Sequence, residues 1–540
     1  MKKVTVILAT LLALVFCSTA FAAFHETGLP ITDEKTSFSM LVDDSYTAED
    51  HKVIYDMLEE QTNVHVDLQL FPYETAREKL NVMLSTGDYP DVIAGWLLGT
   101  KDILELGMDE GTFKPLEALI DKYCPTIKEV LDKKQGEHTV RESMTLPDGH
   151  IYTIPYLTAE PKVTFKPYIN QKWLDNLGLK MPTTPAELKE VLIAFRDKDA
   201  NGNGNPNDEI PFSGDPNNLN LGMLAGWFGV DGAANTDYPY FEIKDGKLHF
   251  TANTPEFRKF LEYFHDLYQE KLIDPEIFTQ DLEQWKAKGK KDLYGVSIAY
   301  GPGDFIEDYK EHLNPEEYKK YGNNQFHALP VLKGCDKPIF HRNSYGDTLF
   351  RTQAAITDKC SDEKAAIILR WFDNLYQEEN SVQSQSGKLG VSIEKLRDGL
   401  YRQFDTREWP EEKRQANDWG HIFTQSLPRY YHDAKVIAFD KEDVEESDMD
   451  KWDKLYEPFL NETFPKIWPT DQKDIDRSSI LTTDINTEVK KMIAQFVSGE
   501  KPLNDQTWAE YCKSLDRLGL PELIEINCRV LGMEPYKGAA

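Results

Sequence analysis

The hydrophobic pattern between residues 37 and 95 changes its period repeatedly, and this alternation is what most constrains the fold. Residues 37–42, 64–70 and 91–95 read as strands, while residues 48–62 and 74–85 place their apolar side chains on one helical face. Strand, helix, strand, helix, strand within so short a stretch predicts a parallel α/β sheet, because parallel strands need helical crossovers. The chain has 540 residues, which is too many for one ordinary core, so we expect at least two lobes.

Later segments carry further signals. Residues 350–357 read as a strand, and a helical pattern follows over residues 362–376. The other expected elements are two short helices over 114–133 that break at Pro125, a hairpin over 144–156, a helix over 168–177, and C-terminal helices over 487–497 and 507–517.

The N-terminus predicts a secretory signal peptide over residues 1–22, followed by a linker over 23–36. Lys2 and Lys3 precede the apolar run 4–16, and Ala20-Phe21-Ala22 supplies an A-x-A cleavage site. The run is too short to span a membrane comfortably. Cys17 offers a lipid anchor as the alternative, although a lipoprotein signal has a small residue where Phe16 stands. We therefore expect an exported protein, periplasmic or extracellular, with anchoring at the cell surface as the alternative.

The net negative charge of the chain limits the classes of molecule that it can bind. The formal net charge is −31, and loss of Lys2 and Lys3 with the signal would make the mature chain more acidic. An acidic surface repels phosphate backbones and anionic lipids, so no nucleic-acid or membrane-surface partner is expected.

The cysteines allow two interpretations. Beyond Cys17 they are Cys124, Cys335, Cys360, Cys512 and Cys528, and none forms a C-x-x-C pair. A disulfide suits an exported protein, and Cys512 and Cys528 are nearest in sequence. Reduced cysteines that act as small buried hydrophobes are the alternative.

The stretch DKDANGNGNPNDE, residues 197–209, concentrates oxygen ligands in one loop. A helix with Thr184 at its N-cap, Pro185 at its first position and Glu187 in a capping box leads into it. Ca²⁺ takes six to eight oxygen ligands, and alternating side chains with glycines between them can supply these. A solvated Asn-Gly turn without metal is the alternative. We expect a structural Ca²⁺.

Two registers of the loop fit Ca²⁺. The first starts at Asp197 and follows EF-hand spacing, with Gly202 at position six and Asp208 at position twelve. The second starts at Asp199 and is shorter. Its ligands are Asp199, Asn201, Asn203, the carbonyl of Asn205, Asp208 and Glu209.

Signatures of catalysis are missing from the sequence. It contains no H-E-x-x-H, no G-x-S-x-G and no Gly-rich phosphate loop. Paired carboxylates for glycoside hydrolysis remain open, because sequence spacing does not report their separation.

Several aromatic residues stand beside glycine or proline rather than on helical faces. Such rings can stack on the apolar faces of sugars, and core packing is the alternative for each. The candidates are Trp96, Tyr156, Trp227, Tyr300, Tyr345, Trp419 and Trp468.

Several segments of the chain resemble those of a known protein family. The segments LEEQTNVHVDLQLFP, KLNVMLSTGDYPDVI and KMPTTPAELKEVLIAFRDKDANGNGNPNDEIPF carry the resemblance most clearly. They are similar to extracellular solute-binding proteins of ABC importers, in the oligosaccharide-binding group that includes maltose-binding-type and alginate-binding proteins.

The resemblance implies an α/β, two-lobed periplasmic-binding-protein fold, type II-like, with a cleft between lobes and crossing hinge strands. Lobe 1 would comprise residues 37–157 and 350–455, and lobe 2 residues 158–349 and 456–540, with the Ca²⁺ loop at 197–209. The protein would act as a non-catalytic monomer that captures an oligosaccharide and delivers it to ABC importer permease subunits.

The resemblance also implies site residues. Similar loops bind Ca²⁺ in the shorter register, which carries over to Asp199, Asn201, Asn203, Asn205, Asp208 and Glu209, although an apparent insertion around Pro206-Asn207 leaves the closing ligands open. Trp96, Tyr300 and Trp468 sit near positions where the family places sugar-stacking rings, and Tyr156, Trp227 and Tyr345 complete the ligand-binding candidates.

Two other functions remain open. One is a secreted Ca²⁺-dependent carbohydrate-active enzyme, which would form product on incubation. The other is a sensory binding protein that signals to a membrane receptor.

Overall fold

The structure is a computed structural model of the whole chain. It describes residues 24–537 apart from 44–51, 136–137, 159–162, 164, 216–220, 235, 237, 307–319, 321–324, 343–347, 407–408, 418–426, 431–433, 445–447, 465–467 and 469–470. The expected signal peptide lies outside the described residues and stays a prediction.

The first sheet has five strands in the order β2-β1-β3-β13-β6. They are β1 (Thr36–Asp43), β2 (Val64–Phe71), β3 (Val92–Ala94), β6 (Thr153–Thr158) and β13 (Thr348–Ile356). β1 pairs in parallel with both β2 and β3, and helices α1 (Lys52–Thr62) and α2 (Tyr73–Thr86) are the crossovers. The predicted parallel α/β unit is confirmed.

The other half of this sheet runs antiparallel. β13 arrives from far along the chain and pairs antiparallel with both β3 and β6. The helix after it, α13 (Asp362–Leu375), buries Trp371 and Phe372 in the core on one face of the sheet. The sequence predicts this strand and helix, but not the direction in which the strand joins the sheet.

The second sheet has four strands in the order β12-β7-β11-β8. They are β7 (Lys166–Asn170), β8 (Ile210–Gly214), β11 (Tyr294–Ala299) and β12 (Phe326–Ala328). β11 is parallel to β8 and antiparallel to β7. Helices α8 (Pro185–Asp197) and α9 (Pro255–Gln269) bury their apolar faces in the core around this sheet.

The prediction of one helix over residues 168–177 is wrong in its first turn. β7 continues through Asn170, and α7 (Gln171–Leu177) begins only there. Tyr168 and Ile169 are fully buried and pair with β11 and β12, so tertiary pairing overrides local helical periodicity. The side chain of Asn170 then caps the helix by accepting a hydrogen bond from the backbone N–H of Trp173.

The predicted start of α8 is confirmed, with one difference. The Thr184 hydroxyl accepts from the backbone N–H of Glu187 at 3.2 Å, as an N-cap does. The Glu187 carboxylate, however, accepts from the backbone N–H of Thr183 at 2.7 Å, one residue before the position a capping box uses.

The remaining elements complete the two lobes and a small three-stranded sheet, β14-β15-β16. They are α3 (Thr100–Asp102), η1 (Ile103–Asp109), α4 (Glu117–Tyr123), α5 (Pro125–Leu131), β4 (Lys134–Gln135), β5 (His138–Thr139), α6 (Val140–Met144), η2 (Leu221–Phe228), β9 (Phe241–Lys244), β10 (Lys247–Phe250), α10 (Leu282–Gly289), η3 (Pro302–Asp304), α14 (Glu378–Ser386), β14 (Ile393–Arg397), β15 (Leu400–Gln403), α15 (Glu411–Gln415), β16 (Lys435–Ile437), α17 (Asp448–Tyr456), η4 (Glu457–Phe459), α18 (Gln472–Ser498), α19 (Asp505–Leu518) and α20 (Leu520–Leu531).

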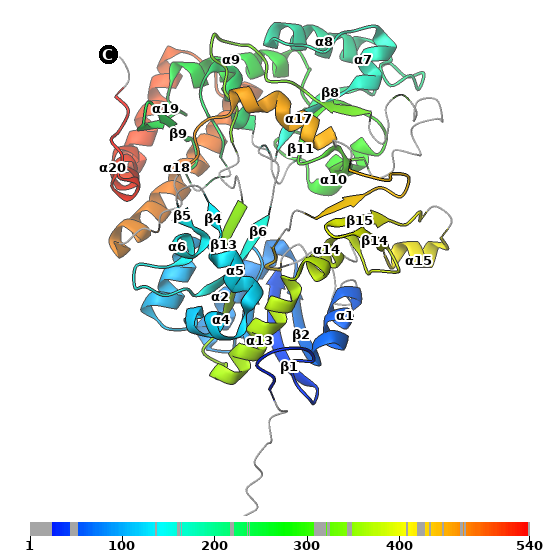
Figure 1. Cartoon of the computed structure of the whole chain (residues 1–540). Coiled ribbons are helices and arrows are strands. Elements are labelled where there is room, and N and C mark those ends of the chain that lie inside the picture. The colour runs from blue at the N-terminus through cyan, green and yellow to red at the C-terminus, as the bar shows by residue number, and fades with distance from the viewer. Residues whose placement is uncertain are drawn as a thin grey trace, which may run out of the picture.

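Buried side chains gather around each sheet separately, which gives the predicted two-lobed α/β architecture (Figure 1). The predicted lobe boundaries stay a prediction, although Trp452 packs in the core of the second sheet and Trp468 in that of the first. The helix α18 enters both cores: Ile475 packs with the first lobe, whereas Leu481 and residues beyond it pack with the second.

One further expectation is wrong. Residues 144–156 contain the predicted turn, in which the backbone N–H of Gly149 donates to Leu146 O, but α6 precedes this turn and β6 pairs with β13. No hairpin forms.

Of the two interpretations of the cysteines, the structure agrees with reduced thiols. Cys512 and Cys528, on helices α19 and α20, are both free. A third C-terminal helix, α20, is also present beyond the two that were expected.

No helix among the described residues is long and apolar enough to cross a membrane.

A buried carboxylate gives the first lobe a specific pH response. Asp373 on α13 accepts from the backbone N–H of Ile127 at 2.7 Å and so caps α5, while burial raises its pKa from 3.8 to about 6. The pKa of Asp373 is higher in the folded state than in the unfolded state, so binding of a proton to Asp373 stabilises the fold. This stabilisation is complete below about pH 3.8 and is lost as the pH rises through about 6. We expect Asp373→Asn to flatten this part of the stability–pH curve, by up to about 3 kcal/mol.

The measurement is urea unfolding between about pH 4 and pH 7. Asp362→Asn, an exposed change on the same helix that removes a pairing with Lys114, is the matched control. Identical pH slopes for the wild type and Asp373→Asn would contradict the assignment.

Candidate functional site

Two exposed aromatic side chains stand at corresponding places in the two lobes. Trp96 follows β3 and is 38% exposed, and Tyr300 follows β11 and is 39% exposed. Among the described residues, they are the only aromatic members of the exposed large hydrophobic side chains. Each follows the carboxyl end of a strand that has a parallel neighbour, which is where open α/β sheets bind ligands.

The Trp96 ring rests on a buried support. Its edge-to-face partner is Tyr156 of β6, with ring centroids 6.3 Å apart and an interplanar angle of 79°. Tyr156 is itself buried, and the fully buried guanidinium of Arg429 lies 5.6 Å from its ring centroid. The backbone of Arg429 is tied to the same strand, because its carbonyl accepts from the N–H of Leu157. The platform under Trp96 is therefore rigid.

The loop after Trp96 is fixed by an ion pair. Arg77 on α2 donates to Leu97 O at 2.9 Å and makes two hydrogen bonds to Asp102 at 2.6 and 2.7 Å. The hydrogen bond to Asp102 raises the pKa of Arg77. Asp102 also accepts from the backbone N–H of Gly99, so one carboxylate orders both ends of the turn.

Tyr300 has a similar setting in the second lobe. Its ring meets Phe165 edge-on at 6.1 Å, and its carbonyl accepts from the Tyr168 hydroxyl at 2.8 Å. Asp304 accepts from the backbone N–H of Gly301 at 3.0 Å. Burial raises the pKa of Asp304, and the neighbouring charge of Asp215, which follows β8, raises it further.

The two aromatic positions flank one crossover between the lobes. The partner of Trp96, Tyr156, lies in β6 before the crossover, and the partner of Tyr300, Phe165, lies just before β7 after it. Each position therefore combines an exposed ring with carboxylates at the edge of a sheet. Rings can stack on the apolar faces of a sugar, and carboxylates accept hydrogen bonds from its hydroxyls.

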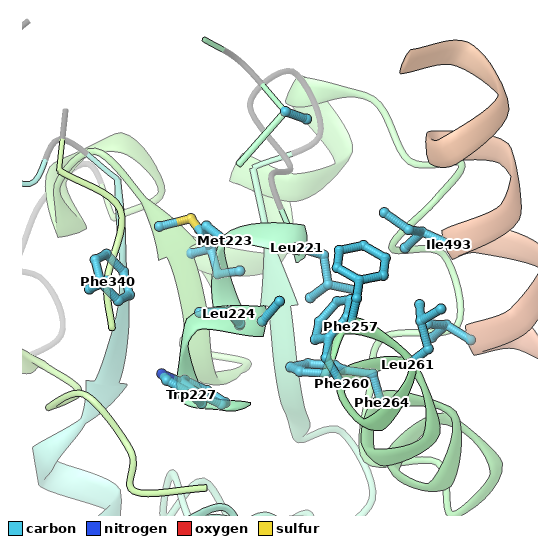
Figure 2. Packing of buried hydrophobic residues seen from close by; sticks show 14 of the residues in the cluster. Leu221, Met223, Leu224, Trp227, Phe257, Phe260, Leu261, Phe264, Phe340 and Ile493 are labelled. Carbon is cyan, nitrogen blue, oxygen red and sulfur yellow. The ribbon is translucent and has the colours of Figure 1, made fainter. Parts of the chain in front are cut away.

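Two of the remaining aromatic candidates, Trp227 and Trp468, are buried. Trp227 on η2 is fully buried and stacks on Phe264 of α9 at 6.2 Å, where Figure 2 shows it beside Leu224. A ring without exposed surface has no face for a sugar, so the ligand-binding role predicted for Trp227 is not supported. Trp468 is 6% exposed, and its indole N–H donates to Ser143 O in the first lobe. Tyr345 lies outside the described residues.

The loop at 197–209 folds into a succession of turns. The Asp199 carboxylate accepts from the backbone N–H groups of Gly202 and Gly204, both at 2.9 Å. The side-chain oxygens of Asn201 and Asn203 each accept from the backbone N–H two residues on. Gly202 and Gly204 have positive φ angles of 78° and 90°, which glycine adopts without strain.

The closing carboxylates of the loop carry the observation that fits a cation. Asp208 Oδ1 and Glu209 Oε2 are buried and have no hydrogen-bond partner in the part of the chain that the structure describes. Burial raises the pKa of Glu209, and the charge of Asp208 adds to this. Buried carboxylate oxygens without a partner are costly, and a bound cation would satisfy them. The described residues contain no group of three or more His, Cys, Asp or Glu that could hold a metal, so this site would need the asparagine oxygens.

The structure also bears on the register of the loop. Asp197 ends α8, and its carboxylate pairs with Arg196 at 2.7 and 3.0 Å. A carboxylate turned toward a cationic neighbour is poorly placed to open an EF-hand loop. The two registers therefore give different expectations for the role of Asp197.

Sequence reasoning missed the residues that support the site. Asp43 accepts from the backbone N–H of Trp96, Arg77 donates to Leu97 O, and Arg429 lies over the ring of Tyr156. Each contact joins parts of the chain that are distant in sequence. The sequence did hold a signal for Asp43, which directly follows a predicted strand just as Gly95 directly follows the core of the next one.

Comparisons with known proteins agree with this geometry. The family model described as bacterial extracellular solute-binding protein matches residues 37–330. The fructooligosaccharide ABC transporter substrate-binding protein FusA of Streptococcus pneumoniae serotype 4 is 28% identical over 516 residues, which cover 92% of this chain and 90% of that protein. Lipoprotein LipO of Bacillus subtilis is 24% identical over 357 residues, 64% of each chain.

Solved structures give the same result. FusA in complex with kestose matches with a TM-score of 0.75 and 27% identity, covering 92% of this chain and 99% of that one. An EF-hand mutant of FusA in complex with fructo-nystose matches with a TM-score of 0.76. The alginate-binding protein AlgQ2 without calcium ion shares the fold, with a TM-score of 0.72 at 21% identity, covering 94% of this chain and all of that one. The chain belongs to the bacterial extracellular solute-binding protein family.

Proposed function

We propose that this protein captures an oligosaccharide between its two lobes and delivers it to the permease subunits of an ABC importer. The observation that carries the proposal is the pair Trp96 and Tyr300, exposed rings at the carboxyl ends of strands in the two lobes, on either side of one crossover. Rings placed in this way can stack on two faces or two units of a saccharide. Family membership supports the transport role.

The cargo proposed first is a short fructooligosaccharide. Structures of FusA, which matches nearly the whole chain, hold kestose and fructo-nystose. The carboxylates of Asp215 and Asp304 near Tyr300 suit neutral hydroxyl donors better than they suit uronates.

We further propose that the protein is exported, acts as a monomer without catalysis or nucleic-acid partners, and holds a structural Ca²⁺. The ion would be bound by Asp199, Asn201, Asn203, Asn205, Asp208 and Glu209. A bound divalent cation would offset the repulsion among the loop carboxylates and stabilise the turn after α8.

A thermal melt of residues 23–540 in Ca²⁺ tests the function. The panel contains kestose, nystose, maltotriose and trigalacturonate. A ligand at a hundred times its dissociation constant adds about 2.7 kcal/mol, so we expect the midpoint to rise by a few degrees with kestose or nystose. No shift with any neutral oligosaccharide would contradict the proposal. Product appearing on prolonged incubation would favour the enzyme alternative.

A further inference from the structure

Asp43 is a buried carboxylate that contacts the backbone of the candidate sugar-stacking residue Trp96. It ends β1, is 2% exposed, and its Oδ1 accepts from the backbone N–H of Trp96 at 2.9 Å. The parallel register pairs Val42 with Ala94, so the next residues on the two strands, Asp43 and Gly95, lie side by side.

The Asp43 carboxylate lies so close to Gly95 that a residue with a side chain would not fit at position 95. Gly95 has a φ of 101°, a conformation that other residues rarely adopt. A Cβ atom at this position would collide with Asp43 Oδ1. On its other side, the backbone N–H of Gly95 donates to Gln353 O of β13 at 2.8 Å. The two peptide N–H groups around Gly95 are therefore held by strands on opposite sides of β3.

We propose that Asp43 is a positioning residue for ligand recognition, which fixes the peptide of Trp96 and thereby the direction of its indole ring. The inference rests on the proposed function, because it assigns Trp96 to the sugar. A hydrogen bond from a backbone N–H to an ionised carboxylate is stronger than one to a neutral acceptor. The edge contact with Tyr156 and the backbone hydrogen bond to Asp43 hold the ring and the peptide of the same residue, Trp96, from two different strands.

The loss of this bond has a definite consequence. When the binding-competent orientation is only partly populated, the apparent dissociation constant rises by the inverse of that fraction. With the Asp43 bond removed, the peptide of Trp96 can rotate about the flexible Gly95. We expect Asp43→Ala to weaken binding about tenfold, which corresponds to the competent orientation falling to about a tenth of the population.

The test is a double-mutant cycle measured by calorimetry with kestose, or with the panel oligosaccharide that gives the largest melting shift. Asp43→Ala should weaken binding about tenfold in the wild type and change it less than twofold in a Trp96→Ala background, because a positioning residue acts through the ring it orients. Asp43→Asn keeps an oxygen acceptor of the same shape and should bind within about threefold of the wild type.

A matched control separates positioning from general destabilisation. Asp373→Ala removes another buried carboxylate that accepts a backbone N–H in the same lobe, and it should lower the melting temperature without changing affinity. Equal weakening by Asp43→Ala in both backgrounds, or unchanged affinity for folded Asp43→Ala, would overturn the inference. Absence of binding by the wild-type protein would instead refute the proposed function, and this is measured first.

Discussion

Replacing Trp96 by alanine will weaken oligosaccharide binding about 30-fold, the loss of about 2 kcal/mol typical of a tryptophan at the centre of a binding site. The ring is large and rigid, and it is supported by Tyr156 and Arg429, so little conformational entropy is lost when it contacts a ligand. Trp96→Phe keeps an aromatic face and should lose less. Isothermal titration calorimetry in Ca²⁺ measures the dissociation constants.

Trp409→Ala is the matched control. Trp409 is partly exposed, and its ring lies 3.6 Å from the ammonium of Lys413, next to α15. Trp409 is a partly exposed tryptophan that follows neither β3 nor β11, and we expect Trp409→Ala to bind with an affinity within about twofold of the wild type. If Trp96→Ala binds as well as Trp409→Ala does, Trp96 is not part of the site.

Calcium will stabilise the chelator-treated protein by about 4 kcal/mol when the ion is present at a thousand times its dissociation constant. Asp208 Oδ1 and Glu209 Oε2, which are buried without partners, should gain ligands when the ion binds. Differential scanning calorimetry with and without Ca²⁺ should show a rise of several degrees, and Asp199→Ala should abolish it.

The two loop registers give different results for Asp197. In the shorter register this residue only pairs with Arg196, so Asp197→Asn should keep the full calcium response. In the EF-hand register it is the first ligand, and the same change would remove most of the response. A wild-type protein whose melting does not respond to Ca²⁺ would show that the loop is a solvated turn.

The sequence predicted the structural elements that depend on interactions between residues close together in the chain. The strands and helices between residues 37 and 95 follow from periodicity, and the N-cap at Thr184 follows from the chemistry of a single turn. The direction of β13 could not be predicted in this way, since it depends on which strand edge is open when that segment arrives. The first turn predicted for residues 168–177 failed for the same reason.

The two Gly-Trp pairs show why the sequence could not predict which tryptophan is exposed. Gly95-Trp96 and Gly226-Trp227 give the same local signal, yet one ring is exposed and the other is fully buried. Gly95 directly follows β3 with a positive φ, and the ring after it is exposed. Gly226 lies in η2 against the backbone of Ile339, and a Cβ at this position would collide with Ile339 O. The next residue, Trp227, is buried in the core. Only the tertiary packing distinguishes them.

The continuity of α18 across the two lobes has a mechanical meaning. Its first turns, at Ile475, are buried with Leu97 and Leu98, the residues that directly follow Trp96, and Asp476 pairs with Lys101 at 3.3 Å. Beyond Leu481 the same helix is embedded in the other lobe. An α-helix resists bending because each turn is hydrogen-bonded to the next. A change in the angle between the lobes would therefore move α18 together with, or against, the segment after Trp96, so that this segment and the interlobe angle are mechanically coupled.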